Sequence, residues 1–381
     1  MKIVFLALAS SFTIGMDYQD NCFCDVLLNE GHKVTIISNS EKYVNGKIEK
    51  TKPEIMTDGN FKLIRLDYNK IISDGLSKKI RMYNGVRSII EQEVPDIIFC
   101  HGICYYSILD VVKYKMSHPE IPIYADTHTS FFNSASNWIS LNVLHKLYYK
   151  ALLKKIEPYL EKFYYIGNEE LDFAVKVYKA DKSKMEFLPL GGFPLQEEIY
   201  QEYRLKKRSE LNIENEILII HSGKLEPNKK TEMLLRAFIK LNNTNVRLII
   251  IGSIPENMKS SIMPLIESDQ RIMFLGWKHK DELKQYLCAC DIYCQPGSVS
   301  ATLQNAICCR CAIISYPHDS YVKDYDYGNI VWERNEDELY NEIKKLCNDK
   351  AKLTEMVNIS KRFGEEVLDY RKIVTRFVNG K

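Results

Sequence analysis

Residues 217–238 read ILIIHSGKLEPNKKTEMLLRAF, an apolar run followed by a polar loop and an amphipathic segment. The apolar run predicts a buried strand, and the spacing of the apolar residues after the loop predicts a helix. A strand that leads through a short loop into a helix presents backbone N–H groups and a helix dipole to an anion. Lys224 and Lys229 add two cations to this loop. The segment therefore predicts a phosphate-binding junction, and an ordinary solvated loop is the alternative.

The alternation of apolar runs and helical patterns continues on both sides of this segment. The runs that predict strands are IVFLAL (3–8), HKVTIIS (32–38), FKLIRLD (61–67), DIIFC (96–100), PIYAD (122–126), FYYIG (163–167), VRLIIIG (246–252), IMFLG (272–276), DIYCQPG (291–297) and AIISY (312–316). Helical patterns lie between most of them, including residues 79–93 and 107–116. This alternation predicts parallel sheets covered by helices, which bind ligands at the carboxyl ends of their strands.

The segment FLPLGGFP at 187–194 divides the chain into two halves. Two glycines flanked by prolines are typical of a linker. A chain of 381 residues is also too long for one typical core. We therefore predict an N-terminal Rossmann-like domain over residues 1–190 and a C-terminal Rossmann-like domain over residues 191–352. The helical, charged tail at 353–381 is expected to pack back toward the N-terminal domain.

Composition and charge narrow the class of protein. The formal net charge is +2, so no overall electrostatic attraction favours nucleic acid as a partner. The 11 cysteines fit no zinc-site spacing and favour core packing in a reducing cytoplasm. The apolar run after Lys2 is interpreted as a buried strand, with a short signal peptide as the alternative. No window of 18 uninterrupted apolar residues predicts a transmembrane helix.

Several segments carry the motifs of one enzyme family. GKLEPNKK at 223–230 resembles the motif G-R-L-x-x-x-K-G, with Lys224 at the position of its Arg and Lys229 at that of its Lys. The other matching segments are FLGW (274–277), DELKQYLCACDIYCQPG (281–297), GHKVTIIS (31–38) and YADTHTS (124–130). Together they resemble glycosyltransferase family 4, a group of retaining nucleotide-sugar enzymes, over nearly the whole chain.

The resemblance implies an α/β GT-B fold, in which two Rossmann-like domains present parallel sheets across a cleft. It implies a metal-independent, hexosyltransferase-like enzyme that moves a sugar from a nucleoside diphosphate sugar to an acceptor hydroxyl with retention, without a cofactor. The implied acceptor is a glycan or a lipid-linked saccharide, as in polysaccharide or cell-envelope biosynthesis. In this scheme Lys224 and Lys229 neutralise the leaving diphosphate, and His128 lies near the transferred sugar.

The donor loop departs from the family pattern. The family carries two glutamates as E-x-x-x-x-x-x-x-E, whereas PGSVSATLQNAICCRCAII at 296–314 contains neither. Asn305 aligns with the second glutamate, or Gln304 does if the alignment shifts by one residue. An amide accepts a hydrogen bond from a ribose hydroxyl without the charge of a carboxylate. The residues expected to bind the donor are Gly223, Gly276, Ser298, Ser300, Thr302, Gln304 and Asn305.

Residues after the first-domain strands form the expected acceptor side. His101 follows DIIFC, and Gly15 lies in the first βα loop, where a glycine lets the backbone approach a ligand. Tyr18 and Gln19 are either acceptor contacts or the first turn of a surface helix. The motif G-x-G-x-x-G is missing there, so no dinucleotide cofactor is expected. We interpret DYD at Asp324–Asp326 as a coincidence, and we predict no bound metal.

Residues 144–160 predict a helix in which leucines and tyrosines mix with four lysines, Lys146, Lys150, Lys154 and Lys155. A basic amphipathic helix either lies on an anionic membrane or packs with its lysines in water. The expected location is the cytoplasm, with peripheral contact at the inner face of the membrane left open. Two other functions stay open: a non-catalytic nucleotide-sugar-binding pseudoenzyme, and a sugar-nucleotide epimerase, for which convincing acid–base carboxylates are missing.

Overall fold

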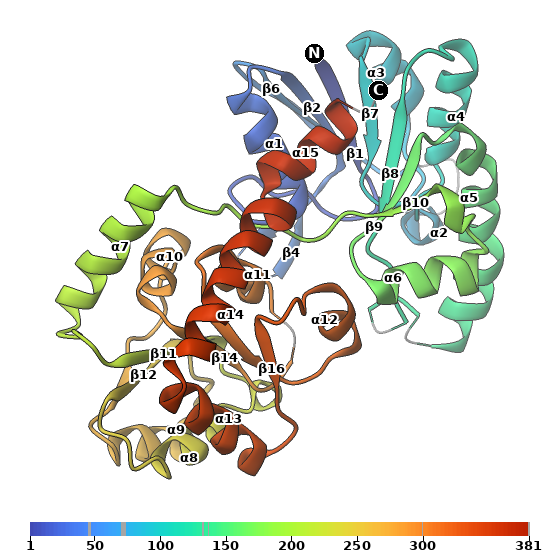
Figure 1. Cartoon of the computed structure of the whole chain (residues 1–381). Helices are drawn as coiled ribbons and strands as arrows, with labels where there is room; N and C mark the ends of the chain where they lie inside the picture. Colours follow the sequence, from blue (N-terminus) through green and yellow to red (C-terminus); the bar gives the residue numbers. More distant parts are fainter. Residues whose placement is uncertain (45–46, 70–73, 132, 136, 299, 380–381) are drawn as a thin grey trace. The chain divides into compact units, whose positions relative to one another are not determined.

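The structure is a computed structural model that describes residues 1–379 except 45–46, 70–73, 132, 136 and 299 (Figure 1). The chain divides into two compact units. The first consists of Met1–Pro189 with Val374–Lys381, and the second of Leu190–Ile373. Residues 353–373 of the expected tail therefore belong to the second unit. Both units are α/β, as the alternation of strands and helices predicts.

The first unit is built on an eight-stranded sheet in the order β10-β9-β8-β7-β1-β2-β6-β5. Neighbouring strands are parallel, except that β5 pairs antiparallel with β6 at the edge. The strands are β1 (Lys2–Ala7), β2 (Lys33–Asn39), β5 (Glu54–Asp58), β6 (Phe61–Leu66), β7 (Ile97–Cys100), β8 (Ile123–Thr127), β9 (Lys162–Tyr165) and β10 (Met185–Phe187). A separate antiparallel pair, which the sequence analysis did not predict, is β3 (Glu41–Val44) with β4 (Lys47–Lys50).

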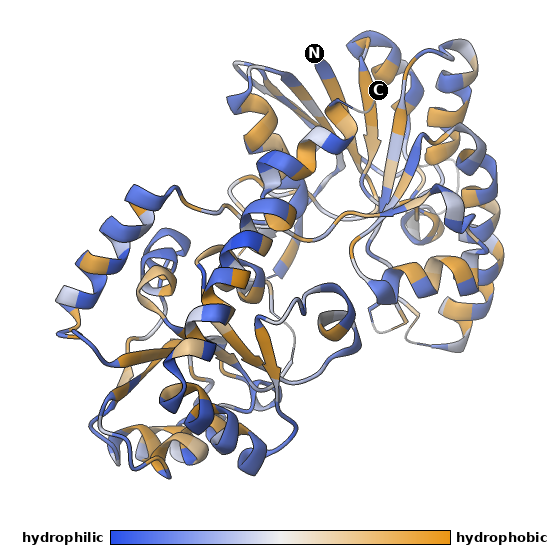
Figure 2. Ribbon diagram, in the orientation of Figure 1, coloured by the Kyte–Doolittle hydropathy of each residue, from blue (hydrophilic) through white to orange (hydrophobic). Residues whose placement is uncertain are grey.

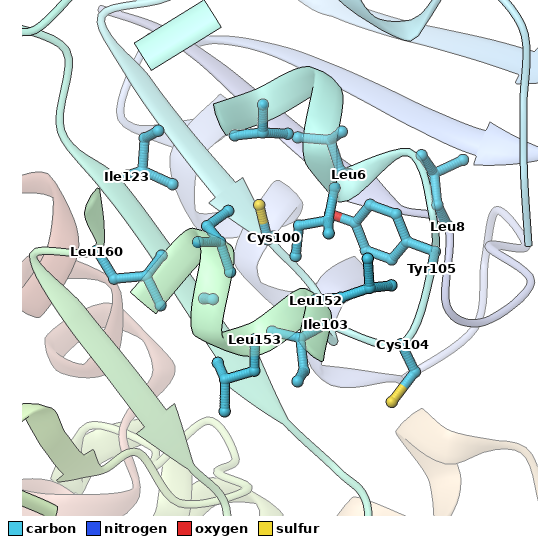
Figure 3. Close-up of a cluster of buried hydrophobic side chains, with 14 of the residues drawn as sticks. Leu6, Leu8, Cys100, Ile103, Cys104, Tyr105, Ile123, Leu152, Leu153 and Leu160 are labelled. Carbon is cyan, nitrogen blue, oxygen red and sulfur yellow. The ribbon is translucent and has the colours of Figure 1, made fainter. Parts of the chain in front are cut away.

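The helices of the first unit flank this sheet, and most of them bury apolar side chains. They are α1 (Gln19–Asn29), α2 (Asp74–Ile80), α3 (Val86–Glu93), α4 (Ile108–Ser117), η1 (Ser140–Tyr149), α5 (Lys150–Ile156), η2 (Glu157–Tyr159), α6 (Asn168–Phe173), η3 (Ala174–Tyr178) and η4 (Lys182–Lys184). Figure 3 shows part of one core, where leucines of α5 face side chains of β1, β7 and the loop at Tyr105. Burial of this apolar surface is the main stabilising term of the unit.

The helix predicted over residues 79–93 is wrong, because the structure has two helices there. α2 ends at Ile80 and α3 begins at Val86. Between them Arg81 and Gly85 have φ angles of 52° and 76°, which lie in the left-handed region and cannot continue a right-handed helix. The apolar periodicity runs through this break, so the pattern alone does not mark it.

The second unit is built on a parallel six-stranded sheet in the order β13-β12-β11-β14-β15-β16. Its strands are β11 (Ile217–Lys224), β12 (Val246–Ser253), β13 (Ile272–Phe274), β14 (Ile292–Gln295), β15 (Ala312–Ser315) and β16 (Ile330–Trp332). Its helices are α7 (Glu197–Glu210), η5 (Pro227–Lys229), α8 (Thr231–Ile239), α9 (Glu256–Glu267), α10 (Lys280–Ala289), α11 (Thr302–Cys308), α12 (Asp319–Asp324), α13 (Glu336–Asn348), α14 (Lys350–Phe363) and η6 (Gly364–Leu368). The strands are apolar along their length, as buried parallel strands should be (Figure 2).

The last helix, α15 (Tyr370–Val378), contains the boundary between the units. Phe377 near its end packs into the first unit, with its ring 4.8 Å from that of Phe99 and 5.4 Å from that of Phe23. These aromatic contacts tie the end of the chain to the first sheet. Within the described part of the chain, no helix is both long and apolar enough to cross a membrane.

Candidate functional site

The loop after β11 is shaped by two glycines on neighbouring strands. Gly223 and Gly252 are paired in the β11–β12 register and have φ angles of 136° and 147°. A Cβ atom at Gly252 would lie 1.8 Å from the carbonyl oxygen of Gly223, so no larger residue fits there. This close approach brings the ends of the two strands together and directs the following loop over the carboxyl edge of the sheet.

Lys229 joins this loop to the loop after β14. Its Nζ donates a hydrogen bond to the carbonyl oxygen of Ser298 at 3.1 Å, although the two residues are 69 positions apart. The backbone N–H of Ser298 in turn donates to the carbonyl oxygen of Asn228 at 2.9 Å. Burial lowers the pKa of Lys229, while Glu226 acts to raise it. A half-buried ammonium is therefore held at the junction of the two loops.

Gly297 makes this contact between the loops sterically possible. A Cβ atom there would lie 2.1 Å from the carbonyl oxygen of Asn228 and 2.5 Å from the carbonyl carbon of Lys229. His318, which follows β15, donates from Nε2 to the carbonyl oxygen of Gly297 at 2.9 Å. The loops that follow three neighbouring strands, β11, β14 and β15, are thus held together by contacts of their backbone groups.

The other predicted donor residues differ in their exposure. Lys224 is exposed at the end of β11. Gly276 has a φ of 66°, and its carbonyl oxygen accepts a hydrogen bond from the N–H of Gly252 at 2.9 Å, which places it beside the same strand ends. The hydroxyls of Ser300 and Thr302 lie 3.2 Å apart and are hydrogen-bonded to each other.

Gln304 and Asn305, the two candidates for the position of the second glutamate, lie on different sides of α11. Asn305 is exposed, whereas Gln304 is buried. The Oε1 atom of Gln304 has no hydrogen-bond partner within the described structure. An unsatisfied buried amide oxygen costs about 1–3 kcal/mol. The amide of Asn305 is therefore in contact with water, whereas Oε1 of Gln304 is a buried acceptor that a ligand could satisfy.

His221, within β11, has a structural role. It is fully buried, with Nδ1 donating to the carbonyl oxygen of Cys294 at 2.9 Å and Nε2 lying 3.0 Å from the hydroxyl of Thr231. Burial lowers the pKa of His221 to about 4, so it is neutral at pH 7. Its two ring nitrogens tie β11 to β14 and to the first residue of α8.

Two buried residues near these loops were missed by the sequence analysis. Gln295, the last residue of β14, donates from Nε2 to the carbonyl oxygen of Ser298 at 2.7 Å, and its Oε1 has no partner among the described residues. Glu333 directly follows β16 and is also fully buried. Both carboxylate oxygens of Glu333 have no hydrogen-bond partner in the described part of the chain. β16 has three residues, which is too short a run to reveal this carboxyl group from the sequence.

Burial also shifts the titration of Glu333. It raises the pKa of this carboxyl group to about 7, against the opposing charge of Lys230. Lys230 itself has a left-handed φ of 53°, and its ammonium lies over the ring of Tyr316 at 4.5 Å. A non-glycine residue in this conformation stores strain and often marks a functional loop.

We predict that Glu333→Gln stabilises the protein at alkaline pH. Between pH 4.5 and about 7 the folded state binds a proton at Glu333 that the unfolded chain has lost, so stability falls as the pH rises through this window. The variant should match the parent in urea unfolding at pH 5 and exceed it by about 1–3 kcal/mol at pH 8. Glu256→Gln, at a carboxylate whose side chain is 87% exposed, is the control. Parallel pH dependences in the parent and Glu333→Gln would contradict this assignment.

The first unit carries a second cluster, formed by His101, Asp126 and His128. His101 follows β7, and the other two lie at the end of β8, where Cys100 pairs with Ala125. The Oδ2 atom of Asp126 lies 2.9 Å from Nδ1 of His101 and 3.2 Å from Nε2 of His128. The parallel register therefore brings both predicted histidines to one carboxylate.

The charge of this cluster is set by Asp126, which the sequence analysis did not single out. Asp126 is fully buried, and its Oδ1 accepts a hydrogen bond from the N–H of Gly102 at 2.6 Å. Burial acts to raise the pKa of Asp126, but the two histidines outweigh it and hold the pKa below its ordinary value. Burial acts to lower the pKa of His101, but Asp126 raises it to about 9. The result is a buried imidazolium–carboxylate pair with His128 on its exposed side.

The remaining residues of the predicted acceptor side, Gly15, Tyr18 and Gln19, lie at or before the start of α1. Gln19 is buried, and neither of its amide atoms has a partner among the described residues. Tyr18 is exposed and precedes the helix, so it is not part of the first turn. Gly15 has a φ of 80° and lines a cavity of about 410 Å³ beside α1, together with Phe12 and Asn21.

His101, Asp126 and His128 are also the residues of the described chain that are best arranged to hold a metal, since their ligand atoms lie within 4.8 Å of one another. By contrast, Asp326 of the DYD segment uses its two oxygens to accept hydrogen bonds from the N–H of Gly328 and the indole of Trp332, at 2.9 and 2.8 Å. These structural bonds support the interpretation of DYD as a coincidence.

Another cavity, of about 270 Å³, lies among Arg204, Asp291 and Arg310 in the second unit. Its charges pair with one another: Arg204 with Asp291, and Arg310 with Glu197. Asp291 precedes β14, so this cavity is at the amino end of a strand. Ligands of parallel sheets bind at the other end, and we interpret this charge network as structural.

Comparison with known families matches residues 203–363 to the model described as glycosyl transferases group 1. A curated protein of Campylobacter jejuni subsp. jejuni serotype O:2, N-acetylgalactosamine-N,N'-diacetylbacillosaminyl-diphospho-undecaprenol 4-alpha-N-acetylgalactosaminyltransferase, is 23% identical over 141 residues. That match covers 34% of this chain and 37% of the Campylobacter protein. The sequence likeness thus spans about a third of each protein.

Solved structures match over the full length. HepE from Anabaena in complex with UDP has a TM-score of 0.68 at 13% identity and covers 100% of this chain and 99% of its own. A glycosyltransferase from Rickettsia africae has a TM-score of 0.67 at 13% identity, with coverages of 99% and 97%. WaaG, a glycosyltransferase involved in lipopolysaccharide biosynthesis, has a TM-score of 0.62 at 12% identity and covers 100% of both chains. At these identities the likeness establishes the fold alone.

Proposed function

Because residues 203–363 belong to the glycosyl transferases group 1 family and the whole chain has the GT-B fold, we propose that this protein is a retaining glycosyltransferase. The family match confirms the resemblance to glycosyltransferase family 4 that the sequence motifs carry. The reaction would move a sugar from a nucleoside diphosphate sugar to an acceptor hydroxyl. The main structural support for this proposal is the hydrogen bond by which Lys229 binds the backbone of Ser298.

The second unit is proposed to bind the donor. Lys224 is the last residue of β11 and Lys229 lies in the loop after it, where the backbone around Gly297 and Ser298 packs against Lys229. A diphosphate at this edge of the sheet would meet two ammonium groups, which stabilise the negative charge that develops on the leaving group. Gly276 beside the same strand ends is proposed to face the base, and Ser300 and Thr302 to supply hydroxyls. The buried Oε1 atoms of Gln295 and Gln304 are unsatisfied acceptors of the kind that a donor hydroxyl would pair with.

The first unit is proposed to act on the sugar and the acceptor. His128 is the more exposed histidine of its cluster, and its Nε2 is held by Asp126. Because a carboxylate only accepts hydrogen bonds, the histidine nitrogens that face Asp126 carry protons. This fixes the tautomer of a neutral His128 and leaves Nδ1 as the atom that can accept a proton or a hydrogen bond. Gly15, Tyr18 and Gln19 are proposed to contribute to the acceptor side.

The acceptor is proposed to be a glycan or lipid-linked saccharide handled in the cytoplasm. The name of the Campylobacter relative describes a transferase whose acceptor is a saccharide on diphospho-undecaprenol. None of the eleven cysteines of this chain forms a disulfide, and ten of them are buried. Free buried thiols suit a reducing compartment, which supports the cytoplasmic location.

The absence of acids from the donor loop favours a second candidate, a non-catalytic nucleotide-sugar-binding protein. Calorimetry with a panel of nucleotide sugars, beginning with the UDP-sugars, followed by turnover assays on the sugars that bind, separates the two. Transfer to an acceptor or slow donor hydrolysis supports the transferase. Tight binding without either reaction supports the binding protein, and no binding to any nucleotide sugar contradicts both.

Activity is predicted to survive metal chelation. Lys224 and Lys229 can carry the diphosphate charge that a divalent cation carries in other enzymes, and the DYD carboxylate of Asp326 is engaged in structural bonds. Turnover in excess EDTA should stay within about twofold of the untreated enzyme. Complete loss of turnover that Mn²⁺ or Mg²⁺ restores would contradict the prediction.

A further inference from the structure

Large apolar side chains are exposed along one face of the helix that leads into α5. Trp138 and Ile139, the two helical residues directly before η1, are 72% and 64% exposed. Val143 and Leu147 on η1 are 42% and 65% exposed. Ile139, Val143 and Leu147 are spaced four residues apart, so their side chains follow one side of the helix. We refer to Trp138, Ile139, Val143 and Leu147 as the apolar stripe.

The opposite side of the same helix is fixed in the core. Tyr149, Leu152 and Ile156 are buried, and Nδ1 of the buried His145 lies 2.7 Å from the hydroxyl of Tyr178. The orientation of the helix is therefore determined, and it cannot rotate to bury the apolar stripe. A helix that is apolar on both sides normally has a second apolar environment. An exposed contiguous apolar face of this kind marks an interaction site.

The charge around the apolar stripe identifies the partner. From Thr127 to Ile156 the chain contains no aspartate or glutamate but four lysines, Lys146, Lys150, Lys154 and Lys155. Lys146 and Lys155 are exposed, and Lys154 pairs with Glu157 at the end of the segment. Lysines at positions 146, 150 and 154 run beside the stripe at the same four-residue spacing. A partner must therefore combine negative charge with an apolar interior.

We propose that the apolar stripe and its lysines dock on the surface of an anionic lipid bilayer. Apolar side chains inserted at the level of the headgroups and lysines beside them bind such a surface together. A tryptophan at the end of the stripe suits the polar–apolar boundary of a membrane. A second copy of the chain is disfavoured, because a symmetric contact would place the lysines of one face against those of the other. This proposal does not depend on the assignment of the reaction.

The test is co-sedimentation with lipid vesicles. The parent protein should bind vesicles that contain about 30% phosphatidylglycerol and leave phosphatidylcholine vesicles largely unbound, and binding should weaken as salt is added. Ile139→Ser with Leu147→Ser should lower the partition coefficient by about tenfold or more. Lys146→Ala with Lys155→Ala should lower it by about fivefold for each lysine removed.

Leu205→Ser is the matched control, because Leu205 on α7 is 68% exposed and lies in the second unit. It should leave vesicle binding unchanged. Circular dichroism checks folding, and nucleotide-sugar binding by the stripe variants should equal that of the parent. Equal binding to neutral and anionic vesicles overturns the proposal, as does a loss with Leu205→Ser as large as with the stripe variant. Concentration-dependent dimerisation that the stripe variant abolishes, without vesicle binding, would identify a second copy as the occupant instead.

Discussion

Lys229→Ala should lower turnover by about 10²-fold or more. A cation placed in advance at the leaving group stabilises the transition state by several kcal/mol, because the site is partly shielded from water. Lys229 is half-buried and held at Ser298, so a neighbouring side chain cannot easily replace it. Lys224→Ala should act in the same direction with a similar loss, since it removes the second cation proposed to face the diphosphate. The measurement is the steady-state rate with the best donor from the binding panel.

Controls must separate the charge of Lys229 from its hydrogen bond to the donor loop. Lys206→Ala removes an exposed lysine of α7 and should leave turnover unchanged. Lys229→Arg keeps the charge and should recover part of the lost rate. Urea unfolding of each variant reports the structural cost, which is expected to be about 1 kcal/mol. If Lys229→Ala and Lys224→Ala both turn over normally, the donor site has been placed at the wrong loop.

Asp126→Asn is expected to lower turnover by about 10²-fold through the histidines that the carboxylate holds. The single oxygen of an amide cannot accept hydrogen bonds from both rings and from the N–H of Gly102, and a neutral amide does not stabilise the His101 imidazolium, so the tautomer and orientation of His128 are lost. His128→Ala should lower turnover by a comparable factor if His128 is the group that contacts the reacting sugar. Asp172→Asn, at a carboxylate whose side chain is 53% exposed in the same unit, is the matched control and should be neutral.

The pH dependence of the unfolding free energy distinguishes the loss of this ion pair from a general loss of folding. The pKa of His101 is raised from 6.5 to about 9, so the stability that the ion pair contributes is complete below pH 6.5 and is lost as the pH rises through 9. The lowered pKa of Asp126 means that its own contribution is present above pH 3.8 and is lost as the pH falls. In Asp126→Asn the decline between pH 6.5 and 9 should disappear. A parent protein whose unfolding free energy is level across that range would contradict the ion pair.

The sequence predicts the repeated strands and helices, the two-part organisation and the family. Each rests on local patterns: apolar runs, glycine–proline breaks, and motifs such as GKLEPNKK. The errors are also local in origin. The helix expected over residues 79–93 is interrupted because Arg81 and Gly85 adopt left-handed angles, which apolar spacing does not encode. Strands β5, β10 and β16 were not predicted, because they are short or lie at the edges of the sheets.

The sequence selected several residues of the candidate site and missed two of its buried acids, Asp126 and Glu333. His128, His101 and Lys229 follow strands in the sequence, and the resemblance of YADTHTS and GKLEPNKK to family motifs selected His128 and Lys229. Asp126 stands two residues before His128 at the end of the same strand, a signal that could have identified it. Nothing local distinguishes Glu333 from the other acids of the chain, because its missing partners are a property of everything packed around it.

Local sequence patterns specify the type of most elements and the residues that stand at the ends of the predicted strands. Which of those ends meet depends on the tertiary structure. Lys229 and Ser298 are 69 residues apart, and His101 and Asp126 are 25 apart. They are neighbours because parallel strands must be joined by crossovers, and the register of those strands is set by how the crossover helices pack on the sheet. The same packing removes Asp126 and Glu333 from water, so it decides that one carboxyl group is ionised between two histidines while the other retains its proton up to about pH 7.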